Sequence, residues 1–257
     1  MITSTANQQV RQLMQLNKKG RLRNAKDVFV VEGPRMFREA PKGRIEKVYV
    51  AESFFKSQWG EKEAGFPYEV VQDSVFKAMC DTQTPQGILC LVKQYHYSLE
   101  ELLKKERPLL LILDNIQDPG NLGTMMRTAE GAGADGVILG PGCVDMYNPK
   151  TIRSTMGSVY RVPFFQARDL QETIAELKGR GIRTFAAYLD GALDYDRPDY
   201  REGTAFLLGN EGNGLTPELA ACADAWVRIP MEGELESLNV SVASAILLYE
   251  AYRQRRL

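Results

Sequence analysis

Three polar stretches in the second half of the chain combine side chains that can bind a ligand and orient a reaction. Each follows an apolar run: residues 114–127 follow 109–113, residues 209–217 follow 205–208, and residues 230–244 follow 226–229. Their amide, hydroxyl, carboxylate and guanidinium groups suit directional hydrogen bonding to a polar substrate. Because an open α/β sheet binds ligands at the carboxyl ends of its strands, the three stretches predict one site.

The glycines of the second stretch allow close approach of a flat ligand. Gly209, Gly212 and Gly214 carry no side chain, so the backbone around them can approach an adenine ring closely. A dinucleotide site is the competing interpretation, but no GxGxxG motif follows the first strand of either half, and residues 140–145 lack its third glycine. A P-loop is excluded because the sequence has no Gly-Lys-Ser or Gly-Lys-Thr motif.

The residues that usually transfer protons or bind metals are scarce. The chain has one histidine, His96, in a charged segment between its halves, where we expect a surface residue and not a catalyst. The four cysteines are scattered without a CxxC pair, which indicates neither a disulfide framework nor a zinc site. No metal site is therefore expected.

The same three stretches resemble the signature motifs of a known family. Residues 119–123 with Arg127, residues 210–214 and residues 237–241 are similar, in this order, to the three motifs of the SpoU/TrmH family of the SPOUT class. Members of this family are S-adenosylmethionine-dependent RNA methyltransferases that modify a ribose 2′-hydroxyl. One short Gly/Asn pattern recurs by chance, whereas three ordered motifs in matching contexts are a specific signal.

The resemblance implies roles for individual residues. The catalytic set that it implies is Asn121, Arg127, Glu211, Ser237 and Asn239. The S-adenosylmethionine site that it implies comprises Leu189, Gly209, Asn210, Gly212, Ile229, Met231 and Leu238. Ile229 and Leu238 are almost equally well explained as core residues, and Ser237 as a helix N-cap.

The implied reaction makes limited demands on the protein. The sulfonium methyl group is already activated, so the protein must mainly position and deprotonate a weakly nucleophilic 2′-hydroxyl. Arginine keeps its proton, with a pKa above about 12. We therefore expect Arg127 to orient the target phosphate and polarise the hydroxyl, while proton removal through Arg127 stays an open alternative. Glu211 is a candidate to anchor Arg127 by a charge-assisted pair.

Alternating patterns predict the elements that position these residues. We expect strands at 109–113, 137–139, 162–165, 183–189, 205–208 and 226–229. We expect helices at 122–132, 149–156, 169–179, 216–222 and 238–254. The alternation predicts an α/β fold with an open parallel sheet and helices on both faces. The family resemblance adds a trefoil knot and a homodimer formed through this C-terminal domain.

The first part of the chain is a smaller alternating α/β unit. We expect a helix over 7–16 that breaks at 18–23, and strands at 28–31, 48–50, 68–71 and 87–92. Residues 29–33, 48–50 and 84–87 resemble the L30e-like substrate-binding domain of the family's ribosomal RNA members, which transfer-RNA members generally lack. The predicted division is a substrate-binding domain at 1–96, a linker at 97–107 and a methyltransferase domain at 108–257.

The net charge of −1 conceals an asymmetry between the two parts. Residues 1–96 hold 15 lysines and arginines against 10 acidic residues, whereas residues 97–257 hold 17 against 23. A basic N-terminal part suggests a polyanionic partner, which in this family is RNA. The candidate phosphate contacts are Arg21, Arg23, Lys26 and Arg35.

The sequence lacks the patterns of a membrane or secreted protein. No apolar run approaches the length needed to span a bilayer, and the N-terminus has no basic-then-apolar signal, so we expect a cytoplasmic protein. The favoured function is 2′-O-methylation of ribosomal RNA, with large-subunit (23S) rRNA as the first expectation. The alternatives are a tRNA 2′-O-methyltransferase and a non-catalytic RNA-binding protein on the same scaffold.

Overall fold

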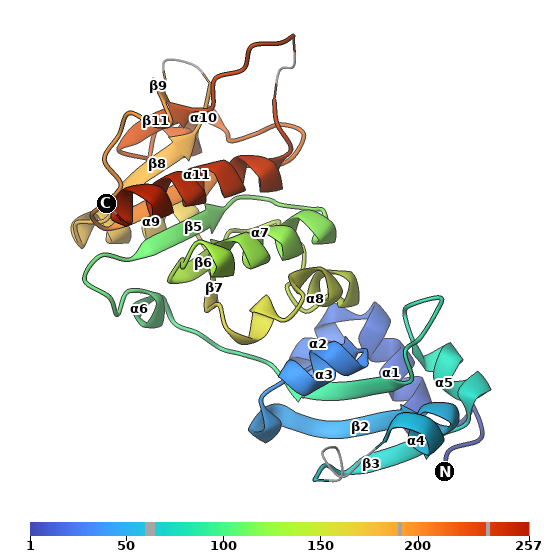
Figure 1. Cartoon of the computed structure of the whole chain (residues 1–257). Helices are drawn as coiled ribbons and strands as arrows, with labels where there is room; N and C mark the ends of the chain where they lie inside the picture. The colour runs from blue at the N-terminus through green and yellow to red at the C-terminus, as the bar shows by residue number, and fades with distance from the viewer. Residues whose placement is uncertain (60–64, 190–191, 235–236, 257) are drawn as a thin grey trace. The chain divides into compact units, whose positions relative to one another are not determined.

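The computed structural model describes residues 1–59, 65–189, 192–234 and 237–256, and the chain divides into two compact units (Figure 1). The first unit comprises residues 1–95 and 145–160, and the second comprises residues 96–144 and 161–257. The chain therefore crosses between the units three times, after Tyr95, after Val144 and after Tyr160.

The described part of the second unit contains a seven-stranded sheet in the order β7-β6-β5-β10-β8-β11-β9. Every pair of neighbouring strands is parallel. The strands are β5 (Leu109–Leu113), β6 (Gly136–Leu139), β7 (Phe164–Gln166), β8 (Arg183–Ala187), β9 (Leu193–Asp194), β10 (Thr204–Leu208) and β11 (Ala225–Arg228). This confirms the predicted open parallel sheet and adds the short edge strand β9, which the sequence pattern did not indicate.

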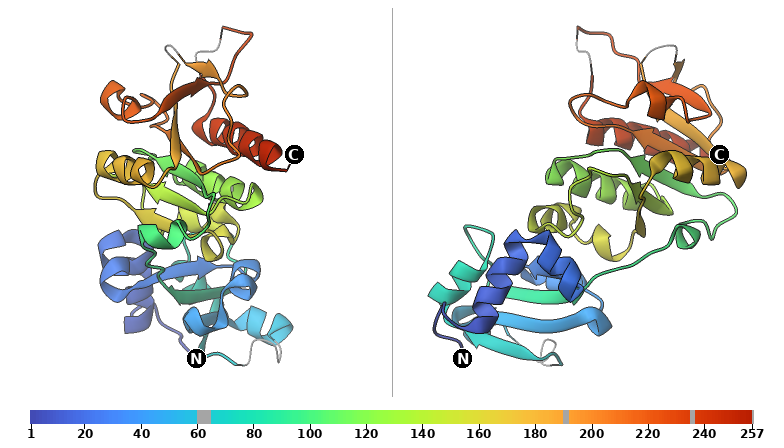
Figure 2. Two further views of the ribbon diagram at one scale, coloured as in Figure 1. Left: turned by 90° about the vertical axis from the view of Figure 1, so that its left-hand side faces the viewer. Right: turned by 180° about the vertical axis from the view of Figure 1, so that it is seen from behind.

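Helices cover both faces of this sheet (Figures 1 and 2). On one face α7 (Pro119–Gly131) packs beside α11 (Val240–Arg255). On the other face α6 (Leu99–Leu102), α9 (Leu170–Gly179) and α10 (Pro217–Ala220) contribute to one hydrophobic core with the strands. Because both faces are covered, every residue of the two central strands β5 and β10 is buried.

The first motif lies on a helix and not in the loop that the sequence pattern predicted. α7 begins at Pro119 instead of residue 122, because the Asp118 side chain accepts a hydrogen bond from the Asn121 amide and Pro119 suits the first helical turn. Asn121 is therefore held in the first turn of α7.

The last helix also begins later than predicted. α11 starts at Val240, and its N-cap is Asn239, whose side chain accepts hydrogen bonds from the amides of Ser241 and Val242. The predicted cap at Ser237 is wrong, because Asn239 satisfies these amides. Ser237 and Leu238 thus lie in the loop before the helix.

The described residues of the first unit contain a four-stranded mixed sheet in the order β1-β4-β2-β3. β4 is antiparallel to both of its neighbours, and β2 and β3 are parallel. The strands are β1 (Val28–Glu32), β2 (Ile45–Ala51), β3 (Tyr68–Val71) and β4 (Ile88–Lys93). The helices of residues 1–95 are α1 (Gln8–Lys18), α2 (Gly20–Lys26), α3 (Pro34–Glu39), α4 (Glu52–Gln58) and α5 (Asp73–Met79), with a 3-10 turn η1 (Lys42–Arg44).

The segment predicted to be broken at residues 18–23 is largely helical. α1 ends at Lys18 with Lys19 extended, and α2 starts at once at Gly20. Asp27 ends α2 in the left-handed conformation, with its amide bonded to the carbonyls of Arg23 and Asn24. The cluster of basic residues therefore lies on a short helix.

Residues 145–160, which we call the arm, pack within the first unit. They form α8 (Pro149–Thr155) and the 3-10 turn η2 (Ser158–Tyr160). The Tyr147 ring stacks on Phe29 with 4.9 Å between centroids, and the Tyr160 hydroxyl donates to the carbonyl of Met36 at 3.1 Å. By sequence order the arm falls in the predicted methyltransferase domain, so the expected division at 97–107 does not anticipate it. The predicted domain boundaries stay a prediction.

Candidate functional site

Side chains from all three sequence motifs form one hydrogen-bonded cluster in the second unit. Asn121 Nδ2 donates to Glu211 Oε1 at 3.1 Å, and Asn239 Nδ2 donates to Asn121 Oδ1 at 3.1 Å. The Ser241 hydroxyl donates to Asn239 Oδ1 at 2.6 Å. The first turn of α7, the loop after β10 and the cap of α11 supply these groups. We call Asn121, Glu211, Asn239 and Ser241 the motif cluster.

Glu211 also holds the loop that precedes α7. Its carboxylate accepts hydrogen bonds from the backbone amides of Gln117 at 3.2 Å and Asp118 at 3.1 Å. Burial raises the pKa of this carboxyl, but the hydrogen bonds from the Asn121 side chain and from the backbone outweigh burial and keep the pKa below its ordinary value. Glu211 is therefore ionised near neutral pH, and it ties the loop after β5 to the loop after β10.

Arg127 lies outside the motif cluster. Its side chain is exposed, and within the described part of the chain no hydrogen bond or ion pair holds it. Six residues separate it from Asn121, which on an α-helix corresponds to about 240° around the axis, so the two side chains leave α7 in different directions. The expected pair between Glu211 and Arg127 is not formed in the structure, because Glu211 bonds to Asn121 and to backbone amides instead.

The loop after β10 folds back tightly on itself. The amide of Asn210 donates to the carbonyl of Gly214 at 3.1 Å, and the reverse bond measures 2.9 Å. The Asn210 side chain accepts from the amide of Gly212 at 2.9 Å and donates to the carbonyl of Asn115 at 2.8 Å. A Cβ atom at Gly209 would lie 2.2 Å from the carbonyl carbon of Gly214, so only glycine fits at this position.

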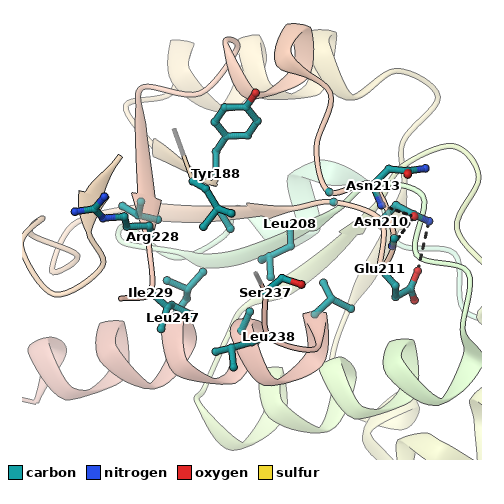
Figure 3. A pocket seen from close by; sticks show the side chains of 18 of the residues that line it. Tyr188, Leu208, Asn210, Glu211, Asn213, Arg228, Ile229, Ser237, Leu238 and Leu247 are labelled. Carbon is teal, nitrogen blue, oxygen red and sulfur yellow. Dashed lines mark hydrogen bonds between the residues drawn. The ribbon is translucent and has the colours of Figure 1, made fainter. Parts of the chain in front are cut away.

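This loop forms one wall of a pocket of about 330 Å³ (Figure 3). All seven residues expected at the cofactor line it: Leu189, Gly209, Asn210, Gly212, Ile229, Met231 and Leu238. Glu211 and Ser237, from the expected catalytic set, line it as well. Segments that follow β8, β10 and β11 thus converge on one cavity with the start of α11, as is typical of ligand sites at the carboxyl ends of parallel strands.

The lining changes in polarity along the pocket. Figure 3 shows the polar side chains of Asn210 and Glu211 together at one end, and the apolar side chains of Ile229 and Leu247 toward the other, where Arg228 also lies. Such a combination of apolar walls with a few fixed polar groups is typical of small-molecule sites. The pocket suits a ligand with a flat ring and a polar extension.

Part of this lining was missed by the sequence reasoning. Leu208 is the last residue of β10 and Tyr188 follows β8, so strand ends alone could have indicated both. Leu247 lies two turns into α11, and only the packing of that helix brings it to the pocket. The amides of Gln117 and Asp118 carry no sequence signal, because every residue except proline has such a group.

The candidate RNA contacts of the first unit fall into two groups. Arg21 and Lys26 are exposed on α2, and Arg35 is exposed on α3, where Glu39 accepts a hydrogen bond from it at 3.1 Å. These three cations are accessible to a phosphate.

Arg23, by contrast, was wrongly expected to be a phosphate contact. Its residue is 3% exposed, and its guanidinium donates to the carbonyl of Leu16 at 2.6 Å and pairs with Asp145 Oδ2 at 2.5 Å. Because these buried contacts occupy the guanidinium, Arg23 is not available to a phosphate. It holds the arm within the first unit.

Three further observations concern His96, metal-binding side chains and membrane spans. His96 is exposed, and among residues whose positions the structure describes no group of three or more His, Cys, Asp or Glu side chains could hold a metal ion. Within the same residues no helix is both long and apolar enough to cross a membrane.

Sequence comparison matches the chain to two families. The sequence model of the "SpoU rRNA Methylase family" matches residues 108–249, and that of the "MRM3-like substrate binding domain" matches residues 7–90. The chain is 36% identical over 250 residues to the "23S rRNA (guanosine(2553)-2'-O)-methyltransferase RlmP" of Bacillus subtilis, a match that covers 96% of this chain and 97% of that protein.

Solved structures give the same result. The AdoMet-bound rRNA methyltransferase from Sinorhizobium meliloti superposes with a TM-score of 0.88 at 31% identity, covering 98% of this chain and 97% of the other. The TrmH/SpoU tRNA-modifying enzyme of A. aeolicus, at 30% identity and a TM-score of 0.53, covers 62% of this chain and 81% of the other. These matches confirm the family resemblance and the α/β fold, while the trefoil knot stays a prediction.

Proposed function

The chain belongs to the SpoU rRNA methylase family, and from this membership we propose that it transfers a methyl group from S-adenosylmethionine to a ribose 2′-hydroxyl of large-subunit (23S) ribosomal RNA. The observation that carries the proposal is the motif cluster, which joins all three sequence motifs beside a pocket at the carboxyl end of the sheet. A scaffold retained only for RNA binding would have no need to keep these polar side chains together.

The pocket residues fit S-adenosylmethionine. Gly209 has no room for a side chain, so the backbone there lies open to a flat ring, and Ile229, Leu238 and Leu247 offer apolar surface to its faces. The polar end near Asn210 offers amide groups to a polar extension of the ligand. When bound, S-adenosylmethionine supplies a methyl group on a positively charged sulfur.

The motif cluster is suited to orient the ribose. Asn121 and Asn239 hold each other in fixed positions, and Glu211 and Ser241 hold them in turn. We infer that these amides, with Ser237 at the pocket wall, place the 2′-oxygen for in-line attack. The 2′-oxygen bonds to the methyl carbon as the carbon–sulfur bond breaks, and the hydroxyl proton leaves to solvent or to a nearby acceptor.

Arg127 acts on the RNA in this proposal. It is exposed and unpaired within the described residues, so its planar guanidinium is available to a phosphate. We assign it the orientation of the target phosphate and the polarisation of the 2′-hydroxyl. Because Arg127 points away from Asn121 on its own helix, a second copy of the chain is the natural source of the motif cluster that meets it.

A homodimer through the α7 and α11 surface supplies that second copy. On α11, Val242 and Tyr249 are large, apolar or aromatic, and 47% and 48% exposed. Gly131 of α7 contacts the Tyr249 hydroxyl closely, since a Cβ there would lie 2.9 Å from it. Arg127 lies one turn before Gly131, so a dimer that covers this surface would bring Arg127 to the interface.

Ribosomal RNA is favoured over tRNA by the first unit. Residues 7–90 match a substrate-binding domain, and residues 1–96 carry an excess of positive charge. The tRNA-modifying enzyme of A. aeolicus covers 62% of this chain, whereas the rRNA methyltransferase covers 98%. We therefore assign RNA recruitment to the first unit, with Arg21, Lys26 and Arg35 as its phosphate contacts. A cytoplasmic location follows for an enzyme that acts on ribosomal RNA.

Labelled-methyl transfer to defined RNAs tests this function. The purified protein with S-adenosylmethionine should label 23S rRNA and leave 16S rRNA and bulk tRNA unlabelled, and the label should map to one 2′-oxygen. Ribose methylation profiles of rRNA from cells with and without the gene should differ at the same nucleotide. Label on tRNA would support the tRNA alternative, and label on a base would refute the reaction class. Full RNA binding without any transfer would favour the non-catalytic alternative.

A further inference from the structure

One group of buried and half-buried side chains in the first unit holds the backbone at two of the three places where the chain crosses between units. Arg23 binds Asp145 Oδ2 at 2.5 Å. The Tyr147 hydroxyl accepts from the amide of Tyr95 at 2.6 Å and donates to the carbonyl of Tyr95 at 3.0 Å. Asp145 Oδ1 accepts from the amide of Tyr147 at 2.9 Å, so the two fastenings are linked. We call Arg23, Tyr95, Asp145 and Tyr147 the junction cluster.

Two members of the junction cluster are adjacent to a crossing, one as the last residue before it and the other as the first residue after it. Tyr95 is followed by His96, and Asp145 is preceded by Val144, and both of these neighbours belong to the second unit. The junction cluster therefore holds the backbone at both crossings from the side of the first unit.

Just before the second crossing, Cys143 and Val144 hold the loop after β5. The amide of Val144 donates to the carbonyl of Ile116 at 2.8 Å, and the amide of Ile116 donates to Cys143 Sγ at 3.4 Å. The next amides of this loop bind Glu211, and the loop then leads into Asn121 at the start of α7. Val144 is thus bonded directly to the loop whose amides bind Glu211 and which leads into Asn121.

The start of α2 is shaped around the same pair. A Cβ atom at Gly20 would lie 2.9 Å from Asp145 Oδ2 and 3.3 Å from Arg23 Nη2. Glycine at this position leaves room for the ion pair. Arg21 and Lys26, the exposed cations proposed to bind RNA, lie on the same seven-residue helix as Arg23.

We propose that the junction cluster is a positioning element of the methyl-transfer reaction. It fixes Asp145, and through the peptide bond to Val144 it restrains the loop that holds Glu211 and Asn121. A phosphate that binds the exposed cations of α2 binds the same helix that carries Arg23. RNA binding in the first unit therefore affects the geometry of the motif cluster. The inference rests on the proposed function and extends it, since no member of the junction cluster touches substrate.

The first experiment measures hydrogen exchange in the full-length protein without ligands. Asp145→Asn weakens the ion pair and keeps the shape of the side chain. Asp81→Asn is the matched control, because Asp81 pairs with Arg153 of the arm at 2.8 Å but lies far along the chain from any crossing. We expect the amides of Gln117 and Asp118 to exchange about tenfold faster in Asp145→Asn and at the wild-type rate in Asp81→Asn.

The second experiment measures single-turnover methyl transfer at saturating RNA. Asp145→Asn should lower the rate by about tenfold or more, because a small misplacement of reacting groups costs much of the rate. The dissociation constants for RNA and S-adenosylmethionine should stay within about twofold of wild type, since the exposed cations and the pocket are unchanged. Tyr147→Phe, which removes the hydroxyl that binds Tyr95, should shift both readouts in the same direction and serves if Asp145→Asn fails to fold.

The outcomes separate this inference from the proposed function. If the wild-type protein transfers no methyl group, the proposed function fails, and the exchange comparison still judges the junction cluster. If wild type is active while Asp145→Asn and Tyr147→Phe exchange and turn over like it, the junction cluster has no positioning role. Equal losses in Asp145→Asn and Asp81→Asn, in step with lower melting temperatures, would mean general destabilisation and would also overturn the proposal.

Discussion

Helices α2 and α7 each carry an arginine that the sequence singled out, and the folded chain uses the two in opposite ways. Arg23 is 3% exposed and is bound to Leu16 and Asp145, whereas Arg127 is exposed and has no partner among the described residues. Removal of a guanidinium that is paired inside the protein leaves a charged partner uncompensated, whereas a guanidinium without contacts is available to a substrate. The comparison teaches that the burial of a cation decides its role.

Substitution of Arg23 is expected to have the largest effect on stability. Arg23→Gln leaves Asp145 without its cation and the Leu16 carbonyl without its donor, so the free energy of unfolding should fall by about 3 kcal/mol. Chemical denaturation measures it, with Arg21→Gln on the same helix expected to stay within about 0.5 kcal/mol of wild type. A stable Arg23→Gln protein with weakened RNA binding would reverse the correction and restore Arg23 as a phosphate contact.

Substitution of Arg127 should leave stability unchanged and lower the rate of methyl transfer. Arg127→Ala and Arg127→Lys should fold and bind S-adenosylmethionine like wild type, and should lose about 10²-fold or more in single-turnover methyl transfer. Lysine should fail because it lacks the planar, multi-donor geometry of the guanidinium. Arg180→Ala, an exposed arginine at the end of α9, should transfer at the normal rate. Activity close to wild type in Arg127→Ala would remove the mechanism proposed for it.

Two glycines in the loop after β10 differ in the room around them: Gly209 lies tightly against the backbone, and Gly212 does not. Gly209→Ala forces a Cβ atom to within 2.2 Å of Gly214, which should cost about 1–3 kcal/mol of stability and weaken S-adenosylmethionine binding. Gly212→Ala meets its nearest neighbour, Asn210 Oδ1, at 3.4 Å and should fold normally. Thermal unfolding and calorimetry measure the two effects, and equal stability of both variants would contradict the tight fold of this loop.

The exposed cations of the first unit should show smaller, salt-dependent effects. In the Arg21→Gln, Lys26→Gln double variant, two phosphate contacts are lost, so the slope of log affinity against log salt should become shallower by about 2. RNA binding measured over a range of salt concentrations gives this slope, while affinity for S-adenosylmethionine should not change. An unaltered slope would move RNA recognition to other residues.

The smallest expected effect concerns the ionisation of Glu211. Its pKa is lower in the folded protein than its ordinary value, so its contribution to stability is complete above about pH 4.3 and is lost as the pH falls through the lowered pKa. The free energy of unfolding of wild type should therefore decrease more steeply below about pH 4 than that of Glu211→Gln. Parallel pH profiles would mean that Glu211 is not held by Gln117, Asp118 and Asn121.

The place of the pocket could be predicted because apolar runs that end in glycine and amide residues mark both the strand and the side of the sheet where it ends. The seven residues expected at the cofactor came from the family resemblance, and all of them line the pocket. The motif Asn121 was also identified, but its place in the first turn of α7 was not. Asp118 caps that turn through a side-chain contact that pattern alone does not reveal.

The arm shows why domain limits were harder to predict. Apolar and polar residues alternate in residues 145–160 as they do in the neighbouring segments. No change in the sequence pattern therefore marks where the chain enters the first unit. The crossing is visible only in contacts such as Tyr147 on Phe29 and Asp145 with Arg23. A fragment that begins at residue 97 would therefore separate Tyr147 and Asp145 from their partners.

The sequence by itself determined the family, the α/β alternation and, through the family resemblance, residues that line the pocket, because hydrophobic period and ordered motifs are local properties of the chain. Tertiary structure alone decided which charges are buried, which loops hydrogen-bond to one another, and that residues 145–160 pack with the first unit. Those outcomes depend on pairs such as Arg23 with Asp145 and Asn121 with Asn239, more than 100 residues apart in the sequence. No local pattern encodes such a pair, since each partner is a polar residue whose contact is decided only when the chain folds.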